Sequence, residues 1–158
     1  MPIRAHTPED RPALRRLVLK LHEVMRQLDP DLQLGEDFLE RYFEQLLAKQ
    51  AGTAGCVFVA EKPGGGLVGY VVLYGRLHPP MADERADAHA WVAELYVLAS
   101  HRSQGLGEAL LGRAEDHARR LGVHKIELSV VAENTAARRF YKRLGYRDRS
   151  LVMSKRLD

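Results

Sequence analysis

Residues 101–110, HRSQGLGEAL, place positive charge and unhindered backbone at the start of an apolar helix. Gly105 and Gly107 have no Cβ atom, so a ligand can approach the backbone closely there. The first amides of a helix have no partner within the helix, and the helix dipole is positive at this end. Arg102 adds a planar group of hydrogen-bond donors. These features predict a phosphate-binding site, whereas the alternative is a tight loop with a solvated arginine.

Two familiar phosphate-binding motifs do not fit this segment. The chain has no GxxxxGK[ST] sequence, which excludes a Walker loop. GLGEAL is similar to the start of a dinucleotide fingerprint, and Glu127 is at a suitable distance downstream for a ribose contact. However, Leu110 stands where the third glycine belongs, and an antiparallel hairpin precedes the segment instead of the first strand of a parallel nucleotide-binding half. A dinucleotide-binding oxidoreductase is therefore the least favoured alternative.

The spacing of apolar residues predicts the elements that position this loop. We expect four helices and six strands, with a tight hairpin at PGGG, residues 63–66. The expected helices cover residues 8–28, 38–47, 105–121 and 133–145, and the expected strands cover residues 2–6, 55–62, 67–76, 90–98, 125–131 and 150–157. Residues 90–131 read as one parallel, right-handed β-loop-α-β unit. The predicted fold is α/β (α+β): a mixed, mostly antiparallel sheet of six to seven strands, about four helices and one central parallel β-α-β unit.

Length and composition limit the function classes. A chain of 158 residues predicts one domain over 1–158, and a single cysteine, Cys56, excludes an internal disulfide and favours a reducing compartment. No stretch is apolar enough for a signal peptide or a membrane span, so we expect a cytoplasmic protein with no membrane partner. A formal net charge of +3 is too small to argue for a nucleic-acid partner. The seven histidines have no metal-ligand spacing, so no metal is expected.

Two segments carry a family resemblance. LYVLASHRSQGLGEALL resembles the acetyl-CoA-binding segment of the GNAT acetyltransferase superfamily, whose signature is Arg/Gln-x-x-Gly-x-Gly/Ala; here these residues are Arg102, Gly105 and Gly107. VVAENTAARRFYKRLGY resembles the family's second motif, an Asn-x-x-Ala helix followed by Phe-Tyr-x-x-x-Gly-Phe/Tyr. Both motifs occur in the family's order and spacing. The resemblance is sharp over residues 92–146 and only topological over residues 1–90.

The resemblance implies where acetyl-CoA binds. The pyrophosphate would lie on the loop and helix start, and the pantetheine arm would pair with the preceding strand as an added strand. Asn134 resembles the asparagine that contacts the arm, although asparagine is also a common helix cap. The expected coenzyme-binding residues are Leu95, Tyr96, Val97, Arg102, Ser103, Gln104, Gly105, Leu106, Gly107, Glu108, Asn134 and Ala137.

Acyl transfer to an amine also needs groups that move protons. By resemblance, Tyr141 stands where the family often places the acid for the leaving thiolate; otherwise it is a core aromatic residue beside Phe140. The resemblance also makes Glu94 the candidate base, directly or through water, because related enzymes often have a carboxylate on this strand; otherwise it is a charge on a solvent-facing position of the sheet. A backbone amide near Val97 is expected to stabilise the oxyanion.

The expected function is N-acetyl transfer from acetyl-CoA to a primary amine by direct attack. The alternative is a non-catalytic acetyl-CoA-binding sensor or interaction module. Asp83, Glu84 and Asp87 form an acidic loop that would attract a cationic acceptor, or they are simply solvated charges. Family members are often dimers, so the expected partners are acetyl-CoA, an amine acceptor and a second copy of the chain in a homodimer.

Overall fold

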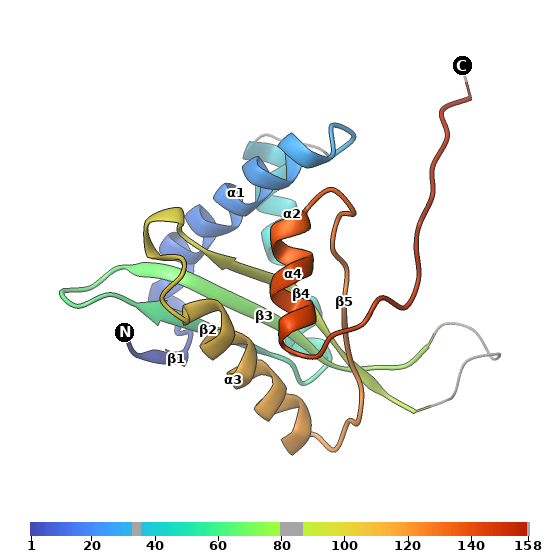
Figure 1. Ribbon diagram of the computed structural model, residues 1–158. Helices are drawn as coiled ribbons and strands as arrows, with labels where there is room; N and C mark the ends of the chain where they lie inside the picture. The colour runs from blue at the N-terminus through green and yellow to red at the C-terminus, as the bar shows by residue number, and fades with distance from the viewer. Residues whose placement is uncertain (33–35, 80–86, 158) are drawn as a thin grey trace.

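The computed structural model describes residues 1–32, 36–79 and 87–157. In these residues it contains four α-helices and one five-stranded sheet, in the order β1-β2-β3-β4-β5 (Figure 1). The helices are α1 (Arg11–Leu28), α2 (Glu36–Gly52), α3 (Leu106–Arg120) and α4 (Thr135–Arg143), and the strands are β1 (Ile3–Ala5), β2 (Cys56–Glu61), β3 (Leu67–Leu77), β4 (His89–Val97) and β5 (Ile126–Leu128).

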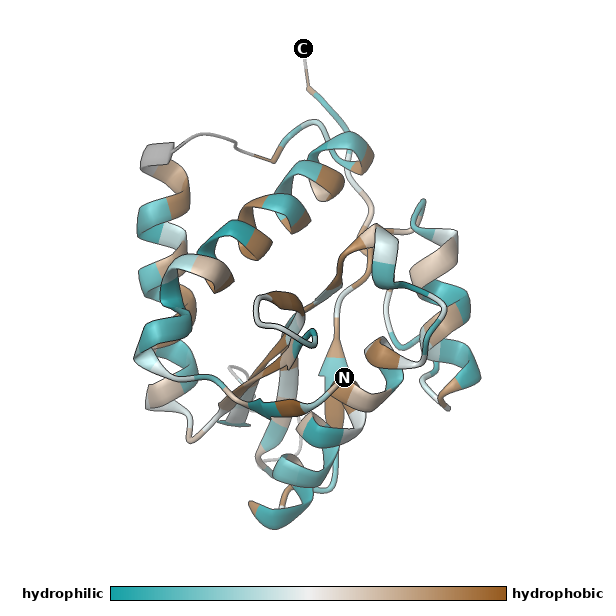
Figure 2. Cartoon of the chain, turned by 90° about the vertical axis from the view of Figure 1, so that its left-hand side faces the viewer, coloured by the Kyte–Doolittle hydropathy of each residue, from teal (hydrophilic) through white to brown (hydrophobic). Residues whose placement is uncertain are grey.

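Helices cover both faces of the sheet and create two hydrophobic cores. The first core joins α3 to β2, β3 and β4, with Phe140, Tyr141 and Leu144 of α4 and its end packed against it. The second core joins α1 and α2 to the opposite face of β2, β3 and β4. The strands are hydrophobic over most of their length, whereas the helices carry hydrophobic residues on one side and hydrophilic residues on the other (Figure 2). This pattern is the one expected for a sheet buried on both faces.

A β-bulge in β4 changes which residues face each core. Val92 pairs with Leu73, and Glu94 pairs with Val72, so Ala93 is an extra residue between the two pairs. Because side chains alternate along a strand, an extra residue reverses the alternation. Val92 consequently packs in the α3 core, whereas Glu94 faces α1 and α2.

The parallel pair β4–β5 is short and opens at one end. Its three pairs run from Ala90–Ile126 to Val92–Leu128. There β5 ends, while β4 continues to Val97. The edge of β4 beyond Val92 therefore has no strand on its β5 side among the described residues, and the opening begins next to the bulge.

Two predicted features of the sheet are wrong. The described residues form five strands instead of six or seven, because residues 150–157 form no strand. The parallel pair also lies at the edge of the described sheet and not at its centre. Apolar, β-prone residues at 150–157 indicate a strand, but a strand also needs a neighbour within hydrogen-bonding reach.

Candidate functional site

The loop before α3 has the geometry expected of an anion site. Gly105 is the N-cap residue of α3, with a φ of 76°, and no side chain caps the helix. Ser103 also has a positive φ, 59°. The first α3 amides are thus left for an outside acceptor. Ser103, Gln104 and Gly105 are exposed, so a ligand can reach them.

Arg102 ties this loop to the end of β4. Its Nε donates a hydrogen bond to the carbonyl oxygen of Val97 over 2.9 Å, and its guanidinium lies 5.7 Å from the centre of the Tyr96 ring. The predicted loop and the predicted pantetheine-binding strand are therefore in direct contact. Arg102 has a structural role in holding this junction, besides any contact that it makes with an anion.

A side chain would meet different surroundings at the two glycines of the motif. A Cβ atom on Gly105 would have no heavy atom within 4 Å, so its positive φ alone favours glycine there. A Cβ atom on Gly107 would lie 3.4 Å from Cζ of Phe140. This is an ordinary van der Waals contact, so the packing of α4 against α3 does not by itself require glycine at position 107. The Glu108 and Arg143 side chains, 3.7 Å apart, also join these helices.

Asn134 is the N-cap of α4. Its side-chain oxygen accepts a hydrogen bond from the backbone amide of Ala137 over 3.1 Å. The helix-cap interpretation of Asn134 is therefore correct. An additional contact of Asn134 or Ala137 with the coenzyme stays a prediction.

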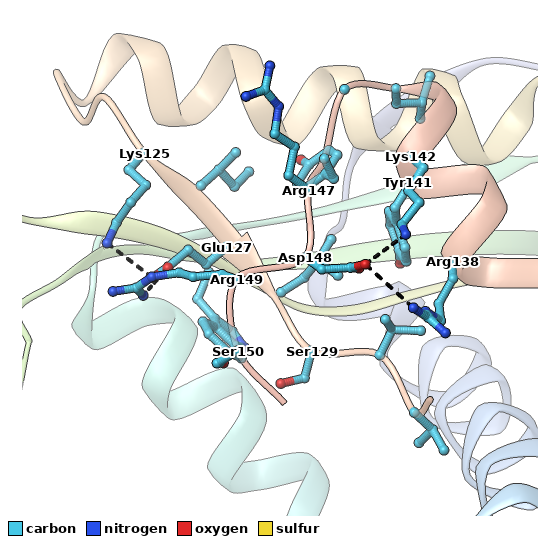
Figure 3. A pocket seen from close by; sticks show the side chains of 18 of the residues that line it. Lys125, Glu127, Ser129, Arg138, Tyr141, Lys142, Arg147, Asp148, Arg149 and Ser150 are labelled. Atoms are coloured by element: carbon cyan, nitrogen blue, oxygen red, sulfur yellow. Dashed lines mark hydrogen bonds and ion pairs between the residues drawn. The ribbon is translucent and has the colours of Figure 1, made fainter. Parts of the chain in front are cut away.

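Tyr141 lies on the α3 side of the sheet, beside an open cleft of about 1450 Å³. Its ring meets those of Phe140 and Tyr146 edge to face, with ring centres 5.1 and 5.7 Å apart. The cleft also reaches Ser129 and the segment after α4 (Figure 3). Burial raises the pKa of Tyr141 to about 12, so the hydroxyl keeps its proton near neutral pH. Tyr141 is thus a packed aromatic residue at the wall of a cleft, and its function as an acid stays a prediction.

Glu94 does not occupy a solvent-facing position, because it is only 5% exposed. Tyr42 donates a hydrogen bond to Oε1 over 2.7 Å, and Tyr70 donates one to Oε2 over 2.8 Å. His22 Nε2 lies 3.3 Å from Oε1. Burial, followed by the charge of Glu94, raises the pKa of both tyrosines. These bonds stabilise a buried carboxylate and occupy the group that was expected to act as base.

Sequence reasoning missed His22, Tyr42 and Tyr70, which belong to three separate elements. His22 Nδ1 is buried and has no hydrogen-bond partner among the described residues. The His22 ring lies edge-on to Tyr42 and Phe38, with ring centres 4.4 and 5.4 Å apart. No local sequence signal marks this cluster, since its members meet only when α1 and α2 pack on the sheet.

Other predicted residues contribute less. Asp83 and Glu84 lie outside the described residues, and Asp87 is exposed. Burial raises the pKa of the Cys56 thiol to about 12, which makes it a poor nucleophile. Within the described part of the chain, no group of three or more His, Cys, Asp and Glu side chains is arranged to hold a metal ion. Over the same residues, no helix is both long and apolar enough to cross a bilayer.

The sequence matches the model of the acetyltransferase (GNAT) family over residues 19–146. The chain is a member of this family. The match includes both motifs, the bulged strand β4 and the cluster around Glu94. The family resemblance of the two motifs is therefore confirmed.

Individual relatives of this GNAT protein are distant. Glucosamine 6-phosphate N-acetyltransferase 1 of Oryza sativa subsp. japonica is 29% identical, over 82% of this chain and 74% of its own. A tetramutant of BH1408 from Bacillus halodurans has a TM-score of 0.84 at 24% identity, over 99% of this chain and 100% of its own. The aminoglycoside N-acetyltransferase AAC(6')-Iy in complex with CoA has a TM-score of 0.73 at 18% identity, over 99% of both chains. These structures show that the fold is shared.

The match to curated relatives is also partial in length. The chain spans 28%, 47% and 58% of three N-acetyltransferases to which it is 30–38% identical.

Proposed function

We propose that this GNAT protein transfers the acetyl group of acetyl-CoA to a primary amine by direct attack. One observation carries the proposal: the N-terminus of α3, which no side chain of the described residues caps, lies next to the open edge of β4. Tyr141 lies on one side of the sheet near this edge, and Glu94 with His22 lies on the other side. The likeness to a CoA-bound aminoglycoside N-acetyltransferase supports the donor.

The donor would lie across the α3 loop and β4. Backbone amides from Arg102 to Glu108 would bind the pyrophosphate, helped by the positive end of the α3 dipole. The amide-bearing arm would pair with the edge of β4 from Leu95 to Val97, because this edge has no strand beside it. This arrangement directs the thioester toward the opening beside the bulge.

The candidate acid and base lie on opposite sides of the sheet. Tyr141 belongs to the α3 side and Glu94 to the side of α1 and α2. We propose that Tyr141 protonates the departing thiolate and that a backbone amide near Val97 stabilises the oxyanion. Direct attack gives a tetrahedral intermediate in which the amine nitrogen and the sulfur are separate substituents of one carbon, so an acid and a base on different sides of β4 would each serve one of them.

We propose that the base is His22, held in place by Glu94, and not Glu94 itself. The carboxylate already accepts hydrogen bonds from two tyrosine hydroxyls, so both of its oxygens are engaged within the protein. A bond from Nε2–H to Glu94 leaves the Nδ1 lone pair of His22 as the acceptor. Glu94 is then a positioning residue that fixes the tautomer, and His22 takes the amine proton.

The second candidate is a non-catalytic acetyl-CoA-binding module. An acceptor screen that measures thiol release from acetyl-CoA distinguishes the two. Amine-dependent thiol release supports the enzyme. Binding of acetyl-CoA without turnover across amino acids, polyamines, aminoglycosides, peptide N-termini and lysines supports the sensor.

Tyr141→Phe tests the chemistry once an acceptor is found. The substitution removes only the hydroxyl, so kcat and kcat/KM should fall together by about 100-fold. The affinity for acetyl-CoA should hardly change, because the hydrogen bond strengthens only as charge develops on sulfur. Wild-type kcat in the variant, where chemistry limits the rate, would leave Tyr141 with a packing role alone.

A further inference from the structure

The open edge of β4 presents a small set of backbone hydrogen-bonding groups. The amide of Leu98 donates to the carbonyl oxygen of Val68 over 2.9 Å, which fixes the side of the chain that faces β3. The preceding residue, Val97, lies opposite Gly69. Because bonded and non-bonded pairs alternate in an antiparallel ladder, the N–H and C=O groups of Leu95 and Val97 point away from β3. These are the groups with which the amide-bearing arm of the coenzyme would pair.

One of these groups already has a partner. Nε of Arg102 donates to the carbonyl oxygen of Val97 over 2.9 Å, and the guanidinium lies 5.7 Å from the centre of the Tyr96 ring. A strand added to a sheet runs about 4.8 Å from its neighbour. The Arg102 side chain therefore stands in the space that the arm would occupy beside Val97.

The Arg102 side chain can leave this position while its backbone stays in place. Its amide donates to the carbonyl oxygen of Ala99 over 3.3 Å, and its backbone is extended, with φ of −72° and ψ of 169°. The residue is exposed, so rotation about the side-chain bonds meets solvent. Arg102 also begins the loop on which the diphosphate would lie, so a second partner for the guanidinium is expected nearby.

We propose that Arg102 makes access of the coenzyme arm to β4 depend on the diphosphate. This inference rests on the placement of the arm and the diphosphate in the proposed function. A bound diphosphate draws the guanidinium away from Val97, because a charge-assisted hydrogen bond is about twice as strong as a neutral one. A thioester without a diphosphate must break the bond between Arg102 and Val97 with no such gain. Arg102 thereby selects acetyl-CoA over truncated thioesters such as acetyl-pantetheine.

Two substitutions separate the two partners of Arg102. Arg102→Ala removes both the bond to Val97 and the positive charge. Arg102→Gln is the matched control, because its side-chain nitrogen is as many bonds from Cα as Nε of arginine. The glutamine NH2 group can keep the bond to the Val97 carbonyl oxygen, but it carries no charge. Melting temperatures show whether the junction between the loop and β4 stays intact in each variant.

The two ligands should respond in opposite directions. Their affinities are measured by nuclear magnetic resonance titration, followed at the amides of Leu95 and Val97. Arg102→Ala should bind acetyl-pantetheine about 5-fold more tightly than the wild type, since no bond has to be broken first. It should bind acetyl-CoA about 10-fold more weakly, because the contact with the diphosphate is lost. Arg102→Gln should bind acetyl-pantetheine as the wild type does, and acetyl-CoA more weakly than Arg102→Ala.

Inorganic pyrophosphate gives a second readout. In the wild type it should raise the affinity for acetyl-pantetheine, and acetyl-pantetheine should raise the affinity for pyrophosphate by the same factor. This coupling should be absent from Arg102→Ala, in which the edge of β4 is open with or without pyrophosphate. A wild type in which the two ligands bind independently would overturn the proposal.

The remaining outcomes distinguish this proposal from the proposed reaction. Equal affinity of Arg102→Ala and the wild type for acetyl-pantetheine would show that Arg102 does not obstruct the arm. Weaker binding of both ligands by Arg102→Ala would leave Arg102 with only a structural role at the junction. Amide signals of Leu95 and Val97 that do not move with acetyl-CoA would contradict the placement of the arm, and this proposal with it. None of these measurements needs an acceptor amine, so acetyl transfer can fail while the selection by Arg102 holds.

Discussion

At the scale of single residues, Glu94 has hydrogen-bond partners for both of its oxygens, whereas one ring nitrogen of His22 has none among the described residues. Glu94 is fixed by two tyrosine hydroxyls and by His22 Nε2, whereas His22 Nδ1 has no partner among the described residues. An unpaired polar atom in a buried place costs about 1–3 kcal/mol. The presence of an unpaired Nδ1 in His22 is explained if the reaction uses this nitrogen as a proton acceptor.

His22→Gln should separate the two nitrogens of the imidazole. The glutamine amide can occupy the position of Nε2 and donate to Glu94, but it offers no base at the position of Nδ1. We expect a melting temperature close to that of the wild type, unchanged acetyl-CoA affinity and a kcat/KM that falls about 100-fold or more. Thermal unfolding, isothermal titration and the thiol-release assay measure these three quantities.

Tyr42→Phe is the matched control and should show the opposite pattern. It removes one donor from Glu94 and leaves both nitrogens of His22 in place. The free energy of unfolding should fall by about 1–3 kcal/mol, while kcat/KM at low temperature stays within a few-fold. If His22→Gln retained full activity, the base would have to be found elsewhere.

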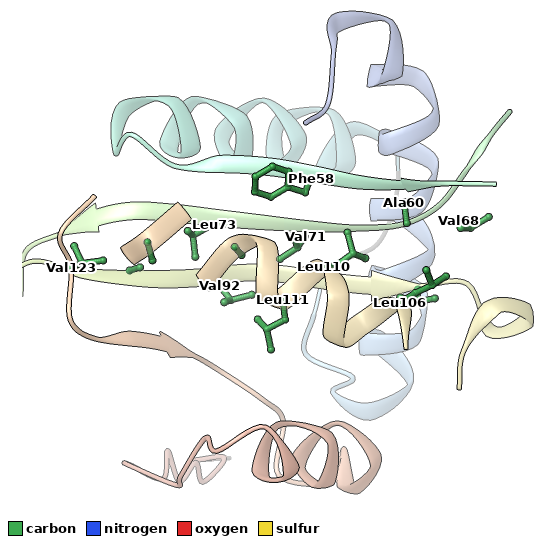
Figure 4. Packing of buried hydrophobic residues seen from close by; sticks show 14 residues of the cluster. Phe58, Ala60, Val68, Val71, Leu73, Val92, Leu106, Leu110, Leu111 and Val123 are labelled. Carbon is green, nitrogen blue, oxygen red and sulfur yellow. The ribbon is translucent and has the colours of Figure 1, made fainter. Parts of the chain in front are cut away.

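At the scale of elements, α3 presents its N-terminus to the loop because its other end and one side are fixed. Leu106, Leu110 and Leu111 belong to one buried cluster with Val71 and Val92 of the sheet (Figure 4). This apolar stripe sets the direction of the helix axis. The positive end of α3 is thereby held next to the end of β4, and Arg102 closes the junction.

Gly105→Ala should weaken acetyl-CoA binding. An alanine at a φ of 76° costs about 1–2 kcal/mol, and its Cβ would occupy the open space above the amides. The stabilisation by acetyl-CoA, measured as a shift in melting temperature, should largely disappear. Gly112→Ala is the control on the same helix, where a Cβ also meets nothing within 4 Å.

Gly112→Ala should raise the free energy of unfolding by about 1 kcal/mol, because alanine has the higher helix propensity. The shift in melting temperature caused by acetyl-CoA should stay the same. Equal acetyl-CoA shifts in both variants would show that the phosphates bind away from this loop.

At the scale of the whole molecule, Arg4 joins β1, β2 and the start of α1. It donates to Asp10 over 2.6 and 2.9 Å and to Glu61 over 2.8 Å. The hydrogen bond from Arg4 is the main reason that the pKa of Asp10 is lowered from 3.8 to about 2. A carboxylate with a lowered pKa stabilises the fold above its ordinary pKa and ceases to do so as the pH falls through its folded pKa.

Asp10→Asn should therefore be destabilising in a pH-dependent way. Because the Arg4 side chain is 37% exposed, water screens the pair, and we expect a loss of about 1 kcal/mol at pH 7. Between about pH 4 and pH 2 the wild type should lose this advantage, and the two unfolding free energies should converge. Urea titrations at several pH values measure the difference. A constant difference down to pH 2 would mean that the charge of Asp10 is not its source.

The sequence alone determined the local parts of this protein. The helices, the hairpin and the β-α-β unit follow from periodicity, and the α3 loop follows from glycine and arginine at fixed spacing. These features depend on residues close together in the chain, where backbone sterics and helix geometry act directly. The residues of the α3 loop can therefore be recognised as one unit from their order in the chain.

Only the tertiary structure decided the environment of Glu94 and the edge of the sheet. The bulge at Ala93 turns Glu94 toward α1 and α2, where His22, Tyr42 and Tyr70 surround it. These partners are separated from Glu94 by 24 to 72 residues, and no local pattern links them. Residues 150–157 have a strand-like composition, yet they pair with no strand among the described residues. Strand pairing and burial are properties of what lies alongside a segment, and the sequence of the segment does not contain that information.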